Sequence, residues 1–169
     1  MIHLATSKRL GALALSFLFG AAIAQEGEPK PPASPPSAAE GEKLFQAGKD
    51  LYEVTCLSCH QANGMGLEAL APPLVGSHWV TNSVERLVRI ALHGMRGPVK
   101  VNGQIYRFET EMLPLAVLSD EQLAAVLTYV RREWGHRASP VSVATVAKIR
   151  EATASREQPW TEDELLKIP

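Results

Sequence analysis

Apolar residues recur three and four positions apart in several segments of the chain, a spacing that places them on one side of an α-helix. The clearest segment follows Ser119, which matches a capping box with Gln122 three positions later. Its apolar positions are Leu123, Val126, Leu127 and Val130. The pattern predicts a helix from residue 120 to about Trp134, which Gly135 ends.

Two earlier segments show the same periodicity. Residues 39–56 are rich in helix formers with an apolar side and predict a first helix. Ser83 is a suitable N-cap for a second helix over 84–93, and Gly94 would end that helix. These helices precede the one that begins after Ser119.

Little of the remaining sequence predicts strands. Asn102-Gly103 predicts the turn of a short hairpin over 99–108. Beyond residue 138, the segments 141–154 and 161–167 carry short helical patterns that we expect to pack on the domain. The sequence therefore predicts a mostly α domain over 38–137 with a helical C-terminal extension over 138–169.

The first 24 residues have the pattern of a secretory signal peptide. A pair of basic residues precedes an apolar run over 10–23, and the small-x-small run 22–24 is a cleavage signal. We expect cleavage after Ala24 and export to the periplasm, with membrane contact only if the leader stays uncleaved. Residues 25–37 are Pro-rich and predict an extended linker.

Composition and charge narrow the range of partners. The 169 residues are 46% hydrophobic and carry a formal net charge of -1. The leader contains basic side chains and no acidic ones, so its removal leaves a mildly acidic protein. Because nucleic-acid binding depends on an excess of positive charge, no nucleic-acid partner is expected.

One short motif carries chemistry. The run Cys-Leu-Ser-Cys-His at 56–60 has the C-x-x-C-H spacing of covalent haem attachment. Residues three and four apart share a helical face, so Cys56, Cys59 and His60 can converge on one porphyrin. The thiols add to the haem vinyl groups, and the imidazole ligates iron from one side of the ring. The motif predicts one covalently attached haem c.

Three other chemistries use closely spaced cysteines: a thioredoxin-like dithiol, half of a zinc site and a small disulfide. A redox dithiol belongs at a strand end in a βαβ unit, a pattern that this sequence does not show. A closed zinc site needs four ligands, and the chain has only two cysteines. Two free thiols in an exported protein would tend to oxidise unless haem attachment used them. Covalent haem is therefore the favoured interpretation.

From about Gly48 to Trp134 the sequence resembles class I c-type cytochromes, and in its later part the cytochrome domains that accompany quinoprotein dehydrogenases. The resemblance rests on the spacing of Gly48 and Tyr52 before the haem motif, on Pro72-x-Leu74-x-Gly76, and on Met112 ahead of the capping box. The order Met-Leu-Pro departs from the Met-Pro of most such domains. The resemblance implies a cytochrome c fold of three to five helices wrapped around one covalent haem.

The resemblance also implies roles for individual residues. His60 and Met112 are expected to be the two axial iron ligands. The carbonyl of Pro72 is expected to accept the Nδ1 hydrogen of His60, with Leu74 of the same loop against the haem. Apart from the resemblance, the residue type alone makes Trp79 a candidate for the haem wall, where its indole N–H would suit a haem propionate.

Other side chains remain open as iron ligands. Met95 lies in another loop and is the main rival of Met112. His78 or His93 would give bis-histidine ligation, although His93 is suited to bond helix-terminal carbonyls and His78 to line the haem edge. His136 follows the last helix of the domain and is expected to be exposed.

These features predict an electron carrier rather than an enzyme, passing single electrons from an exported dehydrogenase to an oxidase or another cytochrome. With protein ligands on both sides, the iron has no open position for a substrate. Two alternatives remain. A weakly held Met112 would allow the haem to bind gas or peroxide, or the chain would act as an electron-transfer subunit docked to a dehydrogenase complex through residues 140–169.

Overall fold

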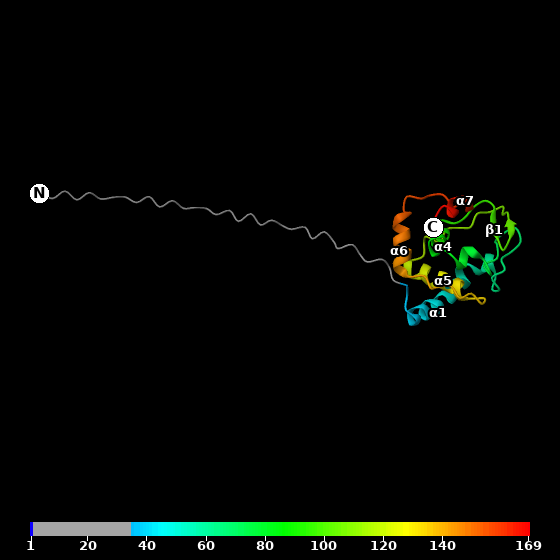
Figure 1. Cartoon of the computed structure of the whole chain (residues 1–169), viewed down its shortest axis with the longest axis horizontal. Helices are drawn as coiled ribbons and strands as arrows, with labels where there is room; N and C mark the ends of the chain where they lie inside the picture. Colours follow the sequence, from blue (N-terminus) through cyan, green and yellow to red (C-terminus); the bar gives the residue numbers. More distant parts are fainter. Residues whose placement is uncertain (2–34) are drawn as a thin grey trace. The chain divides into compact units, whose positions relative to one another are not determined.

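The computed structural model describes Met1 and residues 35–169; the expected signal peptide and most of the expected linker lie outside this part of the chain. In chain order, the helices and strands of the described part are α1 (Ala38–Thr55), α2 (Leu57–His60), α3 (His78–Thr81), α4 (Val84–His93), β1 (Val99–Val101), β2 (Gln104–Tyr106), α5 (Asp120–Arg132), α6 (Val143–Ala152) and α7 (Glu162–Leu166). They form a mostly helical domain with one antiparallel hairpin (Figure 1). The expectation of a mostly α fold is confirmed.

The crossing of α1 and α5 depends on one glycine. A Cβ at position 48 would overlap the carbonyl oxygen of Ala125, so only glycine allows the two backbones to approach this closely. Four residues later, Tyr52 is buried, and its ring centroid lies 5.2 Å from that of Tyr129. The contact of α1 with α5 therefore involves Ala125 and Tyr129.

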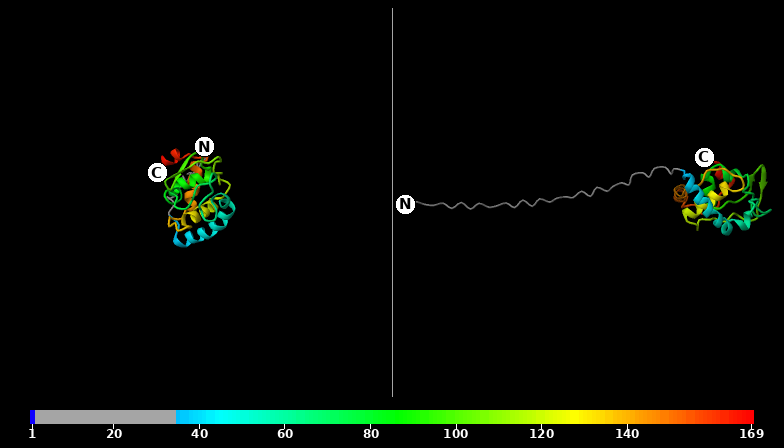
Figure 2. Two further views of the ribbon diagram at one scale, coloured as in Figure 1. Left: turned by 90° about the vertical axis from the view of Figure 1, so that its right-hand side faces the viewer. Right: turned by 90° about the horizontal axis from the view of Figure 1, so that it is seen from below.

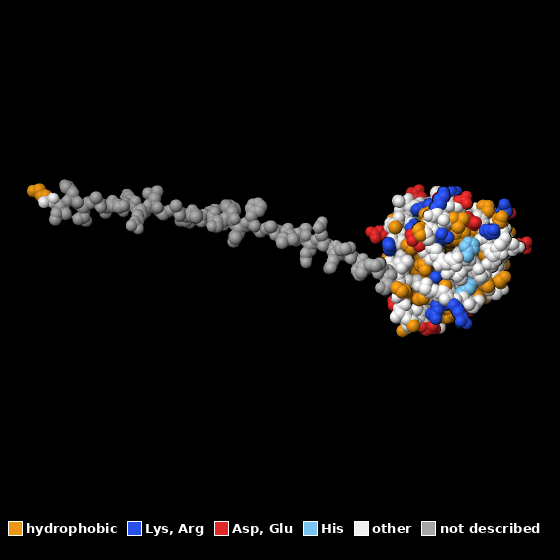
Figure 3. Space-filling model, in the orientation of Figure 1, with side chains coloured by type: hydrophobic (Ala, Val, Ile, Leu, Met, Phe, Trp, Pro, Cys, Tyr) orange, Lys and Arg blue, Asp and Glu red, His pale blue; other side chains and the backbone are white. Residues whose placement is uncertain are grey.

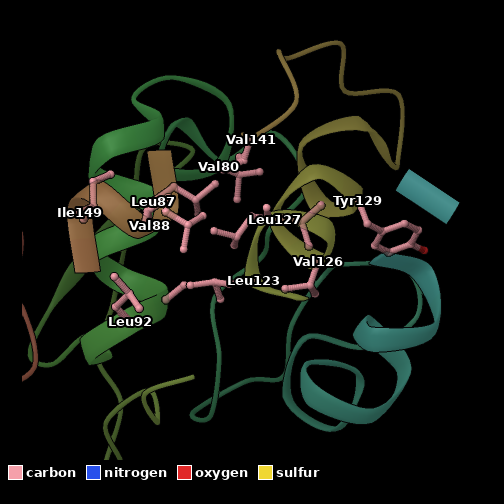
Figure 4. Close-up of a cluster of buried hydrophobic side chains, with 14 of the residues drawn as sticks. Val80, Leu87, Val88, Leu92, Leu123, Val126, Leu127, Tyr129, Val141 and Ile149 are labelled. Carbon is pink, nitrogen blue, oxygen red and sulfur yellow. The ribbon is translucent and has the colours of Figure 1, made fainter. Parts of the chain in front are cut away.

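The main hydrophobic core lies between α4, α5 and α6. Figure 4 shows side chains from these three helices pointing toward one another, while Tyr129 points toward α1. The buried members drawn there include Leu87, Val88, Leu92, Leu123, Val126, Leu127 and Ile149. Complete burial of one such side chain stabilises the fold by roughly 1.5–3 kcal/mol.

A second, smaller hydrophobic cluster lies beside the hairpin, and we call it the hairpin cluster. Its buried members are Trp79, Ile90, Val99, Val101 and Leu165, and the partly buried side chains packed against them are Met95, Tyr106, Phe108, Met112, Trp160 and Ile168. The cluster therefore joins α3, α4, the hairpin, the methionine loops and the end of the chain.

The hairpin forms at the predicted turn. Val99 pairs with Tyr106, and Val101 pairs with Gln104. Asn102 and Gly103 have φ angles of 51° and 82°. Positive φ at both turn positions is typical of a type I′ turn, which Asn-Gly favours.

The predicted N-cap residues correctly mark where two of the helices begin. Ser83 caps α4, and Ser119 forms the predicted capping box of α5 with Gln122. α1 ends at Thr55, one residue before the predicted end, and a separate turn, α2, follows. Cys56 has φ -122° and ψ -29°, which breaks the helix between them.

The C-terminal extension packs on the domain, as expected. Val146 and Ile149 of α6 join the main core, and Leu165 of α7 joins the hairpin cluster. Figures 1 and 2 show α1 and α7 at opposite edges of the described body. The extension therefore packs on α4 and α5 through α6, and on the hairpin cluster through α7.

Candidate haem site

Helix α1 leads directly into the C-x-x-C-H motif. The amide of Cys59 donates to the carbonyl of Cys56 at 3.2 Å, and the amide of His60 donates to the same carbonyl at 2.9 Å. This single turn places both thiols and the imidazole within one helical repeat. Neither cysteine takes part in a disulfide within the described part of the chain.

His60 is held in one orientation by a backbone carbonyl. Its side chain is buried, with 9% of the residue exposed, and Nδ1 lies 3.1 Å from the carbonyl oxygen of Pro72. A carbonyl only accepts hydrogen bonds, so Nδ1 carries the proton and Nε2 keeps its lone pair. This is the contact that the resemblance implied for Pro72.

The environment of His60 favours the neutral ring. Burial lowers the pKa of His60 below its usual value, and the hydrogen bond to Pro72 opposes this effect only in part. Within residues 35–169, Nε2 forms no hydrogen bond. A neutral imidazole with a free Nε2 is the form that binds a metal.

The loops on either side of His60 are fixed by backbone hydrogen bonds. Gly66 N donates to the carbonyl of His60 at 3.0 Å, and Leu74 N donates to the carbonyl of Gly64 at 2.8 Å. Tyr52 donates its hydroxyl hydrogen to the carbonyl of Gln61 at 2.7 Å. Leu74 is partly buried and packs on the main core, in the loop that also carries Pro72.

Trp134 and His136 follow α5 and support these loops. The sequence did not assign either residue to the site. Trp134 donates its indole N–H to the carbonyl of Ala62 at 3.0 Å. A Cβ at Gly64 would lie 2.7 Å from the Trp134 ring, so the two are in close contact. The only sign of this role in the local sequence was an aromatic residue directly before Gly135.

His136 is the second of these residues, and the expectation that it is exposed is wrong. Its Nε2 accepts a hydrogen bond from Gly76 N at 2.9 Å, and its Nδ1 lies 2.9 Å from the carbonyl of Val130. The ring therefore links the Pro72 loop to the end of α5. The sequence could not reveal this because the partner amide lies 60 residues away.

The two candidate methionine ligands lie opposite each other. Met95 and Met112 form an isolated antiparallel bridge, in which Met112 N donates to the carbonyl of Met95 at 2.9 Å. Directly opposed residues of an antiparallel pair direct their side chains to the same face. The structure thus places Met112 beside Met95. Their positions in the fold therefore do not decide which of the two methionines is the iron ligand.

Three other residues that the sequence suggested as iron ligands or haem-wall residues, His93, His78 and Trp79, contact side chains or carbonyls of the protein itself. His93 Nε2 lies 2.8 Å from the hydroxyl of Thr153 in the extension, rather than at a helix-terminal carbonyl. His78 lies against Trp79, with ring centroids 4.7 Å apart. The indole N–H of Trp79, expected to suit a propionate, donates to the carbonyl of Lys100 at 3.0 Å.

Charged side chains are intermixed on the surface. On the face drawn in Figure 3, basic and acidic side chains lie next to each other. Arg89 pairs with Glu85 at 2.7 Å, and Arg86 donates to the carbonyl of Ile168. These two arginines of α4 are therefore engaged within the protein.

The residues of the site fit a covalent haem. Two thiols three residues apart supply the attachment points, His60 supplies a neutral imidazole, and Met95 or Met112 supplies a thioether. The loop after His60 and the loop that carries Met112 also keep large apolar side chains exposed, which a porphyrin could cover. These are Met65, Leu67, Leu70 and Leu113, with 55%, 40%, 39% and 78% of each residue exposed.

Among the residues that the structure describes, no helix combines the length and apolar character that crossing a bilayer requires.

The proteins that this chain resembles in sequence are haem proteins, as the residues of the site suggest. The cytochrome c family model matches residues 38–134. The chain is 30% identical over 138 residues to a cytochrome c-552 of Thermus thermophilus, covering 76% of this chain and 91% of the relative.

Two further relatives are larger proteins. The chain is 31% identical over 126 residues to the cytochrome c subunit of a quinone alcohol dehydrogenase from Gluconacetobacter polyoxogenes, covering 69% of this chain and 25% of that subunit. It is 32% identical over 107 residues to the fructose dehydrogenase cytochrome subunit of Gluconobacter japonicus, covering 61% of this chain and 22% of the relative. The matched part is about a quarter of each dehydrogenase subunit.

The family match over more than half of the chain and the C-x-x-C-H geometry lead to one conclusion. The chain belongs to the cytochrome c family, as a class I c-type cytochrome that carries electrons on covalently attached haem c.

Proposed function

We propose that this protein is a periplasmic monohaem carrier that takes single electrons from an exported dehydrogenase and passes them to a downstream oxidase or cytochrome. The proposal rests chiefly on His60: its Nδ1 is bound to Pro72 and its Nε2 is free, directly after two thiols. Met112 would supply the second protein ligand to the haem iron.

Each residue of the site has a separate task in this proposal. Cys56 and Cys59 would hold the haem through thioethers, and Pro72 would keep the His60 ring in the orientation needed for ligation. The bound haem supplies an iron that cycles between the ferric and ferrous states. With His60 and Met112 as ligands, the protein orients the group and excludes water and substrate from it.

The proposed periplasmic location is supported by the leader pattern over residues 1–24, with cleavage after Ala24.

A second candidate is an electron-transfer subunit of a dehydrogenase complex. The observation in its favour is the similarity to the cytochrome subunits of alcohol and fructose dehydrogenases. In that case the C-terminal extension, which includes the exposed Leu166, would be the docking element. Copurification of a dehydrogenase with the native protein would favour this candidate, and a stable, reducible monomer would favour the free carrier.

The carrier proposal is tested by spectroscopic redox titration of the holoprotein, followed by addition of carbon monoxide to the ferrous form at neutral pH. A carrier with two protein ligands should titrate as a single one-electron step and bind carbon monoxide slowly or not at all. Fast, stoichiometric binding would contradict the proposal and indicate a haem that binds gas or peroxide.

A further inference from the structure

We propose that the C-terminal extension, residues 138–169, holds the Met112 loop in the position needed for iron ligation, with Arg150 and Trp160 as the positioning residues. This inference rests on the proposed function because it takes Met112 as the sixth ligand. The structural part of it, control of the loop by the extension, can be tested separately.

The Met112 loop, residues 107–118, has few hydrogen bonds of its own. The only backbone bond within it in the described structure runs from Leu118 N to the carbonyl of Leu115 at 3.0 Å. Its other backbone contacts leave the loop: Met112 N donates to Met95, and Leu115 N donates to the carbonyl of Ala91 at 2.7 Å. A segment with so few internal bonds takes its stability from the groups around it.

Arg150 of α6 supplies the contacts at the C-terminal end of the loop. Its guanidinium donates to the carbonyls of Ala116 at 2.9 Å and Leu118 at 2.7 Å. The same group forms an ion pair with Asp120 at 2.7 Å, at the start of α5. One side chain of the extension thus satisfies two loop carbonyls, and hydrogen bonds from a charged donor are stronger than neutral ones.

Trp160 supplies a second point of attachment, through Met95. Its amide donates to the carbonyl of Gly94 at 3.1 Å, and its carbonyl accepts from Arg96 N at 2.9 Å. Met95 therefore lies between two partners, Trp160 in a parallel bridge and Met112 in an antiparallel one. The extension, the Met95 segment and the Met112 loop form a continuous set of backbone pairs.

The Trp160 ring is itself held firmly. Arg156 lies over it, with the guanidinium carbon 3.4 Å from the ring centroid, and Arg89 of α4 lies 5.6 Å from that centroid. The ring also packs in the hairpin cluster with both methionines. The indole position is therefore fixed by contacts from α4 and from the extension.

A further set of contacts fixes the extension to α4. Ser83 donates to the carbonyl of Pro169 at 3.0 Å, Arg86 donates to Ile168, and His93 contacts Thr153. The extension thus spans α4 from its N-cap to its last residue. Because α4 also carries Ala91, which receives Leu115 N, the helix and the extension hold the loop from two sides.

The test combines two measurements on the ferrous holoprotein of the variant Arg150→Met, which keeps the aliphatic stem and removes every donor. The expected results are carbon monoxide binding about tenfold faster than in the wild type, and hydrogen exchange about tenfold faster at the amides of Met112 and Leu115. A tenfold change corresponds to a decrease of about 1.4 kcal/mol in the free energy of loop opening. Arg150→Lys keeps a positive charge for Asp120 and should give an intermediate effect even if Arg150→Met folds poorly.

Val146→Ala is the matched control, because Val146 lies on the same helix, is fully buried and makes no hydrogen bond to the loop through its side chain. It should lower global stability while leaving the carbon monoxide rate unchanged. Equal rates in the Arg150 variants and Val146→Ala would overturn the proposal. If Met112→Ala binds carbon monoxide as slowly as the wild type, Met112 is not the iron ligand. In that case the hydrogen-exchange rates at Met112 and Leu115 alone decide whether the extension positions the loop.

Discussion

His60 and the paired methionines define the chemistry at the residue scale. The Pro72 carbonyl commits one nitrogen of the His60 ring and leaves the other free, so the orientation of this ligand is set by the fold. The fold also pairs the two residues that could supply a thioether ligand, Met95 and Met112.

Replacing each methionine by alanine in turn separates the two thioethers. Met112→Ala is expected to open the sixth iron position and lower the reduction potential, because a thioether ligand stabilises ferrous haem. Met95→Ala should keep the wild-type spectrum and change the potential little. Visible spectra and redox titrations of both holoproteins provide the measurement, and the reversed pattern would assign the iron ligand to Met95.

Gly48→Ala tests the close crossing of α1 and α5. The added methyl group would overlap the backbone of Ala125, which no change of side-chain rotamer can relieve. We expect a loss of about 3 kcal/mol in the free energy of unfolding, measured by denaturant titration. Gly41→Ala on the same helix is the control, since its Cβ would meet only side chains, the nearest atom being Cγ of Pro140 at 3.1 Å. Equal losses in the two variants would contradict the role given to the crossing.

Helix ends are the feature that local sequence specifies best at the scale of elements. Ser119→Ala removes the side chain that accepts the amide of Gln122 at 3.2 Å, and should cost about 1 kcal/mol of stability. Ser119→Asp retains an acceptor and should recover most of this loss. Denaturant titration of the three proteins checks the prediction, which is wrong if Ser119→Ala and Ser119→Asp behave alike.

The extension should loosen in acid through Glu164. Hydrogen bonds from the Thr161 amide and from Arg156 lower the pKa of Glu164 from 4.5 to about 2. Because the folded pKa lies below the unfolded one, the carboxylate stabilises α7 fully above pH 4.5, and this contribution disappears as pH falls toward 2.

Hydrogen exchange at Leu165 N, which donates to the carbonyl of Thr161, measures this loosening. Between pH 4.5 and 2, local protection should fall in the wild type after correction for intrinsic exchange, and should vary much less in Glu164→Gln. Glu157→Gln serves as the control because Glu157 lies in the same extension and is exposed. Identical pH profiles for the wild type and Glu164→Gln would contradict the prediction.

Short-range patterns account for most of the elements that were predicted correctly. Ser83, Ser119 and Asn102-Gly103 act on the backbone within three residues, so their effects are visible in sequence. The break at Cys56 and the one-turn helix α3 were not predicted, because a single turn has too few positions to show periodicity.

At the scale of the whole molecule, contacts distant in sequence are the part that sequence could not supply. The link from His136 to Gly76 spans 60 residues, and that from Arg86 to Ile168 spans 82. The sequence predicted that the extension would pack on the domain. It did not predict that the extension would contact the segments that carry the two methionines, because Trp160 and Arg150 have no local mark of that role.

The central claim is that one haem is joined to Cys56 and Cys59 of this chain. The most direct test is intact mass spectrometry with a pyridine haemochrome spectrum, on protein produced in cells that have cytochrome c maturation machinery. The account predicts a mature chain cleaved after Ala24 that carries one haem, with the haem on the peptide that contains both cysteines. A colourless product with the mass of the polypeptide alone would contradict it.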